Sequence, residues 1–198
     1  MVSVQIVSAK SLLQHAATLY DDRSFPFSQQ AKHAWKGGFY SGAAWMELVL
    51  SELRGQPQRS VPKCLQGFGI LKYTLTSIAA LIVLAIAITT QIYPLIMFSI
   101  PAFYAVEVQM VFLFPITLDR FPNPFRTSLQ WTQYAGGTIT AMRIVLVLAI
   151  VILLGGLFGK GFVRCWCLGC LSVVLWYEQI RKTRMELAGS HSPAAGNP

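Results

Sequence analysis

Charged side chains are scarce in this sequence. Only 12% of the 198 residues are Asp, Glu, Lys or Arg, whereas 54% are hydrophobic, and the mean hydropathy is +0.52. A typical soluble domain carries about 25% charged residues. The apolar residues also occur in long blocks, which favours membrane spans over one large soluble core. We therefore expect an integral membrane protein.

Acidic residues are the scarcer charge, with 8 Asp and Glu against 16 Lys and Arg, so the net charge is +8. In a soluble protein this balance would indicate nucleic acid as a partner. Here the basic residues flank apolar runs, so we expect contact with anionic membrane lipids and no nucleic acid. The residues expected at lipid headgroups are Lys63, Lys72, Arg120, Arg126, Arg181 and Lys182.

Cysteine and histidine are also few. The four cysteines are too few and too clustered for a secreted disulfide framework. His15, His33 and His191 are scattered, so we expect no metal site, and no motif indicates a cofactor. The N-terminus lacks a basic stretch followed by an apolar block, so we expect no signal peptide and assign insertion to the first span.

Four apolar runs predict the membrane domain. They cover residues 70–93, 95–115, 138–158 and 162–177. The connection between the first two is only a few residues, which predicts an antiparallel hairpin, and glycines mark a second turn near residue 160. Pro101 should kink the second run. We therefore predict an all-α, polytopic membrane protein with about four transmembrane helices in two hairpins, preceded by a small cytoplasmic helical headpiece.

Residues 1–63 have the pattern of this headpiece and a linker. Apolar residues recur every three or four positions in two stripes, and Gly37-Gly38 divides the second stripe. The stripes either pack on each other as a helical hairpin, or Trp35, Phe39, Tyr40 and Trp45 seat the headpiece on a partner or on the membrane surface. Residues 64–180 then form the transmembrane domain, and residues 181–198 form a tail that is first basic and then disordered.

The basic residues also predict an orientation. They lie before the first span, in the middle loop and in the tail, whereas the turn between the first two spans has none. The positive-inside rule then places both termini in the cytoplasm, and we expect a bacterial inner membrane or a plasma membrane.

Glu107 is a carboxylate near the centre of the second run. A buried charge in a membrane normally has a partner, and Arg143 is expected at a similar depth in the third run. We therefore predict an intramembrane ion pair between Glu107 and Arg143. This pair either fixes helix register, or Glu107 acts as a proton relay or as a polar anchor for a ligand or partner.

Cys165, Cys167 and Cys170 lie near the start of the fourth run, and the last two have CxxC spacing. Such a pair can form a redox disulfide, and neighbouring Arg164 would favour a thiolate. A four-helix membrane protein with this motif resembles the vitamin K epoxide reductases and DsbB-type thiol oxidoreductases. The resemblance implies that Cys167 and Cys170 exchange electrons. Those families use a second cysteine pair in an outer loop, and the predicted outer turns here contain none. The alternative is that these cysteines are packing residues.

Two functions from different classes follow from these observations. We expect an accessory, assembly or scaffold subunit of a larger membrane complex, with other membrane subunits as partners, rather than an enzyme. The alternative is a membrane-embedded enzyme acting on a lipid or quinone, with Glu107, Cys167 and Cys170 as the candidate catalytic residues. A small transporter is disfavoured because the spans contain few polar residues.

Overall fold

The computed structural model describes residues 8–22, 24, 26–36, 38–158 and 161–190 of the chain. Within these residues all regular structure is helical, as expected, and no strand is present. Three helical segments are long and apolar enough to cross a membrane: Cys64–Thr89, Tyr93–Leu118 and Gly137–Leu157. The chain is therefore a helical membrane protein.

The N-terminal helices are α1 (Ala9–Asp21), α2 (Phe27–Lys36) and α3 (Gly38–Arg54). The side chain of Ser8 accepts a hydrogen bond from the Lys10 amide and caps α1. Leu12, Ala16 and Tyr20 form the buried stripe of α1. Helix α2 ends at Lys36 and α3 begins at Gly38, whose φ is +68°, so the second stripe forms two helices as its glycines predict. Helix α3 ends before Gly55, whose φ of +62° reverses the chain.

Of the two alternatives for the aromatic residues near the N-terminus, the surface role is not met at Trp45. Its side chain is buried, and its Nε1 donates a hydrogen bond to the Phe27 carbonyl 3.1 Å away. The Trp45 ring also contacts the Phe27 ring edge-on. Trp45 therefore holds α2 against α3, as the packed alternative predicts. The side chain of Trp35 lies outside the described residues.

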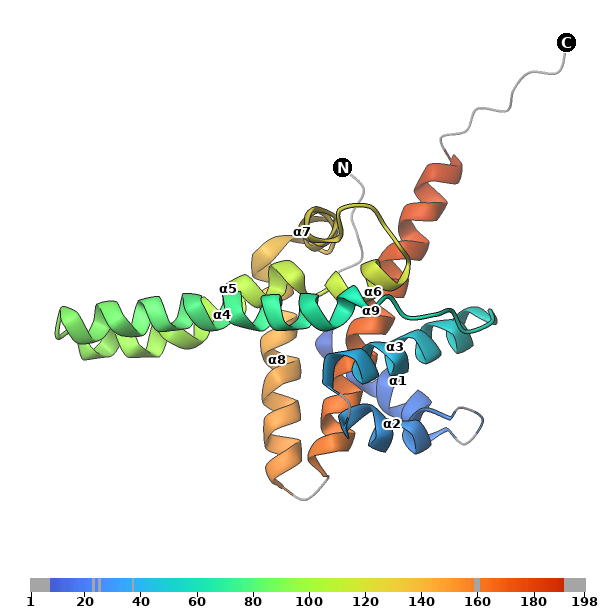
Figure 1. The fold of residues 1–198 in the computed structure, drawn as a ribbon, viewed down its shortest axis with the longest axis horizontal. Coiled ribbons are helices and arrows are strands. Elements are labelled where there is room, and N and C mark those ends of the chain that lie inside the picture. Colours follow the sequence, from blue (N-terminus) through green and yellow to red (C-terminus); the bar gives the residue numbers. More distant parts are fainter. Residues whose placement is uncertain (1–7, 23, 25, 37, 159–160, 191–198) are drawn as a thin grey trace, which may run out of the picture.

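Helix α4 (Cys64–Thr89) and the segment that follows it form a long antiparallel hairpin (Figure 1). The returning segment is not one helix. It begins as the 3₁₀ turn η1 (Tyr93–Phe98), continues as α5 (Ser99–Glu107) and η2 (Val108–Met110), and ends as α6 (Leu113–Leu118). Pro101 lies near the start of α5, whose N–H groups have no intrahelical partner, so the proline is tolerated there.

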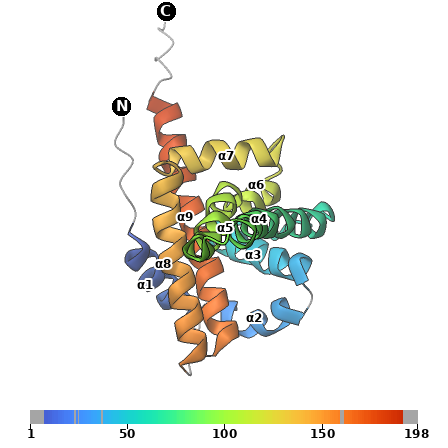
Figure 2. The same cartoon turned by 90° about the vertical axis from the view of Figure 1, so that its left-hand side faces the viewer.

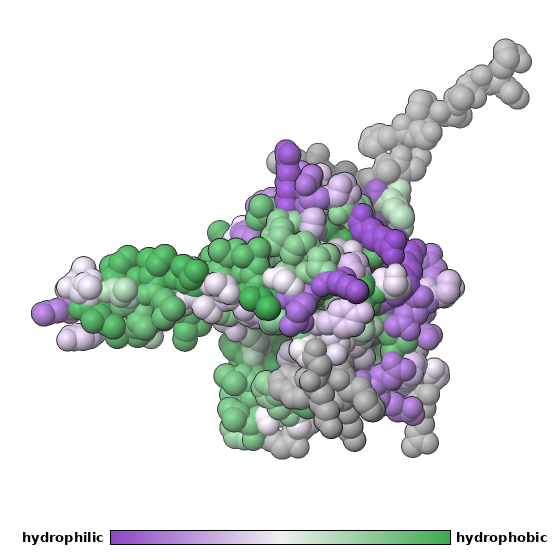
Figure 3. All heavy atoms as spheres, viewed as in Figure 1, coloured by the Kyte–Doolittle hydropathy of each residue, from purple (hydrophilic) through white to green (hydrophobic). Residues whose placement is uncertain are grey.

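The α4–α5 hairpin extends away from the rest of the molecule, and apolar side chains cover it on the visible face (Figure 3). Exposed large hydrophobic side chains occur along both helical segments of the hairpin, including Leu81, Ile82, Met97, Phe98 and Ile100. An exposed apolar surface of this length is stable only when lipid or another apolar surface covers it.

The second half of the chain contains α7 (Pro124–Tyr134), α8 (Gly137–Leu157) and α9 (Phe162–Ser190). Helix α7 begins with proline at its first position, where no N–H is needed. Helices α8 and α9 pack side by side as a second hairpin. In Figure 1 this hairpin runs across the direction of α4 and α5, and Figure 2 shows α4 and α5 from their free end while α8 still runs vertically.

The prediction of a fourth span is not confirmed, because α9 is not among the three candidate spans. Its apolar half packs against α1, α2 and α3, so these N-terminal helices cover it. Leu171, Val174, Trp176 and Tyr177 are accordingly buried in the core. Helix α9 also continues without a break past the predicted boundary at residue 180, and residues 191–198 lie outside the described part of the chain.

Candidate functional site

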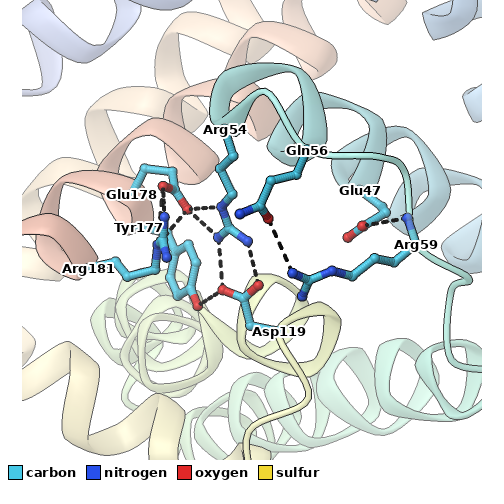
Figure 4. A network of polar contacts seen from close by, with 8 residues as sticks. All are labelled: Glu47, Arg54, Gln56, Arg59, Asp119, Tyr177, Glu178 and Arg181. Atoms are coloured by element: carbon cyan, nitrogen blue, oxygen red, sulfur yellow. Dashed lines mark hydrogen bonds and ion pairs between the residues drawn. The ribbon is translucent and has the colours of Figure 1, made fainter. Parts of the chain in front are cut away.

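A polar network lies where α3, α6 and α9 meet. Arg54 is the last residue of α3, Asp119 follows the last residue of α6, and Tyr177 and Glu178 belong to the middle of α9. These residues are distant in sequence, yet Figure 4 shows their side chains pointing toward one another. The network therefore joins the headpiece, the end of the long hairpin and the C-terminal helix.

Arg54 is the centre of this network. Its Nη1 and Nη2 atoms donate to the two carboxylate oxygens of Asp119 at 2.6 and 2.8 Å, which is a bidentate pair. Its Nε atom donates to Glu178 Oε1 at 3.0 Å, and Nη2 contacts the same oxygen. One guanidinium therefore binds two carboxylates, which an ammonium group could not do in this geometry.

Both carboxylates accept hydrogen bonds from further donors. The Tyr177 hydroxyl donates to Asp119 Oδ2 at 2.5 Å, and Arg181 donates to both oxygens of Glu178 at 3.0–3.2 Å. The side chains of Arg54, Asp119 and Glu178 are each only 8–10% exposed. Charges removed from water to this degree are tolerated because their hydrogen-bonding capacity is used.

Burial and ion pairing shift the pKa values of Asp119 and Arg54 in opposite directions. Burial alone would raise the pKa of Asp119, but hydrogen bonds from Arg54 and Tyr177 outweigh it and hold that pKa below its ordinary value. For Arg54, burial favours the neutral form, and the bonds to Asp119 and Glu178 instead raise its pKa. Asp119 and Arg54 are therefore both ionised at neutral pH.

A cavity of about 430 Å³ opens beside the network. Its wall combines basic and aromatic side chains with one carboxylate: Arg54, Gln56, Arg59, Asp119, Phe121, Trp131, Arg181, Arg184 and Met185. The linker after α3 forms one side of it. The buried Glu47 side chain accepts the Arg59 backbone N–H at 3.0 Å, which fixes that linker on the headpiece. Burial raises the pKa of Glu47.

The structure places the residues expected at lipid headgroups in two groups. Lys63, Arg120, Arg126 and Lys182 are exposed, which is compatible with that expectation. Lys72 is buried and lies next to Glu107, and Arg181 is bound to Glu178. These two basic residues neutralise carboxylates in the fold, so their charges are not free for lipid.

The predicted ion pair between Glu107 and Arg143 is wrong, because the partner of Glu107 is Lys72. Lys72 Nζ lies 3.4 Å from Glu107 Oε1, and their side chains are 7% and 16% exposed. Arg143 is exposed on α8 and forms no ion pair in the described part of the chain. The reason is that α4 runs beside α5 in the hairpin, whereas α8 crosses it, so a basic residue near the base of α4 reaches Glu107. The Lys72–Glu107 pair joins α4 to α5 at the base of the hairpin.

The cysteines lie in a setting that disfavours thiol chemistry. Cys165, Cys167 and Cys170 are free thiols, and Cys167 is fully buried. Burial raises the pKa of Cys167 to about 12, so its thiolate is rare at neutral pH. Arg164, expected to stabilise a thiolate, instead pairs with Asp21 of α1 at 2.5 Å. Among the described residues no cluster of His, Cys, Asp or Glu could hold a metal ion.

The sequence indicates basic residues near the membrane but does not predict this network. The one local signal is a carboxylate shortly after each of two apolar runs: Glu178 directly follows one, and Asp119 lies four residues beyond another. Comparison with known protein families, with characterised proteins and with solved structures found no match.

Proposed function

We propose that this protein is a membrane-anchored accessory or scaffold subunit, in which the α4–α5 hairpin is the anchor and the remaining helices form a docking body on one side of the membrane. The observation that carries this proposal is the length of apolar hairpin that the rest of the chain leaves uncovered. Lipid and the spans of a partner subunit are the two surfaces that could cover it.

The orientation of α8 supports one particular arrangement. Helices α4 and α8 run in different directions, so only one of them can cross a flat bilayer along its normal (Figure 1). Helix α1 packs on α8 and α9 and exposes Lys10, Asp21 and Asp22. If α8 spanned the bilayer, α1 would enter the membrane beside it, where its exposed charged side chains are unfavourable. The α4–α5 hairpin therefore spans, and α8 lies along the membrane surface.

The side chains of α8 fit this position. Ala141, Ile144, Val145 and Leu148 are buried in the body, whereas large apolar side chains such as Ile150, Leu153, Leu154 and Leu157 are exposed. Figure 2, viewed from the free end of the hairpin, shows α8 on the face from which the hairpin projects. A helix with one face in the body and an apolar face outward can lie in the membrane interface.

The distribution of basic residues supports a topology in which both termini lie on the same side of the membrane. The body carries the exposed basic residues Lys63, Arg126 and Lys182, whereas the hairpin tip, residues 89–94, has no lysine or arginine. By the positive-inside rule the body, with both ends of the chain, is cytoplasmic.

Cysteine labelling of sealed membrane vesicles tests this topology. In a Cys64→Ser background, Thr90→Cys at the hairpin tip should react with an impermeant maleimide only from the outer side. Phe158→Cys, at the far end of α8, should react only from the cytoplasmic side. If both cysteines react from the outer side, the chain forms two spanning hairpins and the arrangement proposed here is wrong.

The subunit role is tested by native mass spectrometry of the complex extracted in mild detergent. A stoichiometric membrane partner, cross-linked to the hairpin through a photoreactive residue at Leu81, is the expected result. A lone monomer or homo-oligomer that carries only lipid at the hairpin would contradict the subunit role while leaving the anchor in place.

A further inference from the structure

The cavity beside the Arg54 network contains more positive charge than the fold uses. Four guanidinium groups line it, against the single carboxylate of Asp119. Two of these groups, Arg54 and Arg181, are bound to Asp119 and Glu178. Their charge is therefore neutralised within the protein.

The other two guanidinium groups have no carboxylate at ion-pair distance in the described part of the chain. Arg59 donates to the Gln56 side chain at 3.2 Å, which is a neutral acceptor (Figure 4). Arg184 lies over the Trp131 and Tyr134 rings, with its central carbon 5.2 and 4.5 Å from their centroids. Ring stacking orients a guanidinium while its N–H donors remain available.

Trp131 provides an independent observation. Its side chain is 2% exposed and lines the cavity, and its ring is stacked on Tyr177 with centroids 4.7 Å apart. Its indole Nε1 is buried and has no hydrogen-bond partner within the described residues. A buried donor without an acceptor costs about 1–3 kcal/mol, so native proteins rarely leave one unsatisfied.

A hydrogen-bond acceptor with negative charge would suit the Arg59 and Arg184 guanidinium groups and the Trp131 indole N–H. We infer that the cavity binds a phosphomonoester, with its phosphate held by Arg59 and Arg184 and hydrogen-bonded by the Trp131 indole. Guanidinium groups match phosphate oxygens in geometry and bind them with charge-assisted hydrogen bonds. Phe121 and Met185 then contact the organic part of the ligand. A volume of about 430 Å³ is within the range of small-ligand sites.

The phosphomonoester could belong to a soluble metabolite or to the headgroup of a lipid such as phosphatidic acid. The full chain is reconstituted in phosphatidylcholine nanodiscs and titrated by calorimetry with glycerol 3-phosphate. A second preparation contains phosphatidic acid in the same nanodiscs. If the soluble ester binds saturably in both preparations, the ligand is soluble. If phosphatidic acid abolishes that binding, or only the lipid remains bound after extraction, the headgroup is the ligand.

Variants separate the cavity from general surface charge. Arg59→Gln and Arg184→Gln should each weaken binding about tenfold, because each removes one charge-assisted contact. Lys182→Gln is the matched control: it removes the same charge two residues from Arg184, but Lys182 is exposed and does not line the cavity. It should leave affinity within about twofold.

Trp131→Phe keeps one aromatic six-membered ring and removes the N–H donor together with the five-membered ring of the indole, so it should weaken binding about fivefold. Far-UV circular dichroism and the melting temperature establish that each variant is folded. The inference is overturned if neither form of the phosphomonoester binds saturably to the folded wild-type chain. It is also overturned if Lys182→Gln weakens binding as much as Arg184→Gln, since the effect would then be unspecific attraction.

Discussion

Removing the guanidinium of Arg54 should destabilise the protein more than any exposed charge substitution. Arg54 and its two carboxylate partners are each only 8–10% exposed, so water can do little to replace the lost contacts. In Arg54→Met the apolar stem is retained, but Asp119 keeps only the Tyr177 hydroxyl and Glu178 keeps only Arg181. Breaking a buried pair costs about 3–5 kcal/mol, and we expect a loss of that size.

The assay is equilibrium unfolding by urea in mild detergent at pH 7, followed by far-UV circular dichroism. Arg54→Lys keeps the charge but cannot bind both carboxylates in a fork, so its loss should be smaller. Arg120→Met is the matched control, because Arg120 is exposed and, within the described residues, its side chain donates a hydrogen bond only to Ser60, at 3.3 Å. We expect it to cost less than about 1 kcal/mol. If Arg54→Met costs no more than this control, the network is effectively solvated and the reasoning is refuted.

Three further predictions follow from other parts of the molecule. Cys167, buried and with a pKa of about 12, should react with maleimide far more slowly at pH 7.5 than exposed Cys64 in the native protein, and equal rates in single-cysteine variants would contradict the burial. A Cβ at Gly69 would lie 2.3 Å from a ring carbon of Phe39 in α3, so Gly69→Ala should lower the free energy of unfolding by about 1–3 kcal/mol. Gly67→Ala has open space around it and should be neutral or stabilising in the same urea titration. The pKa of Asp119 is lower when folded than when unfolded, so its stabilisation is present at neutral pH and declines as the pH falls below about 4; Asp119→Asn should flatten this part of the stability–pH curve, and an unchanged slope would show that other carboxylates control it.

Local patterns predicted individual helices well. The apolar run at residues 138–158 corresponds to α8 (Gly137–Leu157), and the glycine pair at 37–38 separates α2 from α3. The short connection near residue 92 forms the predicted hairpin turn. These features depend on composition, helix propensity and turn chemistry within a few residues, and such information is contained in the sequence.

The fourth span shows where local patterns fail. An apolar stretch in a membrane protein can be covered by lipid or by other helices of the same chain, and hydropathy does not distinguish the two. The structure covers the apolar half of α9 with α1, α2 and α3. Trp131 illustrates the same point, because it is buried against Tyr177 of α9, a contact that no local pattern indicates.

By itself the sequence determined that this chain is helical, enters a membrane and has a short-turned apolar hairpin, because length, hydropathy and turn residues act locally. Only the tertiary structure decided the charge partners. Glu107 meets Lys72 instead of Arg143, and Arg54 meets Asp119 and Glu178, which are 65 and 124 residues away. Pairing in a low-dielectric interior depends on which helices touch and at what crossing direction, and that is decided when the whole chain packs.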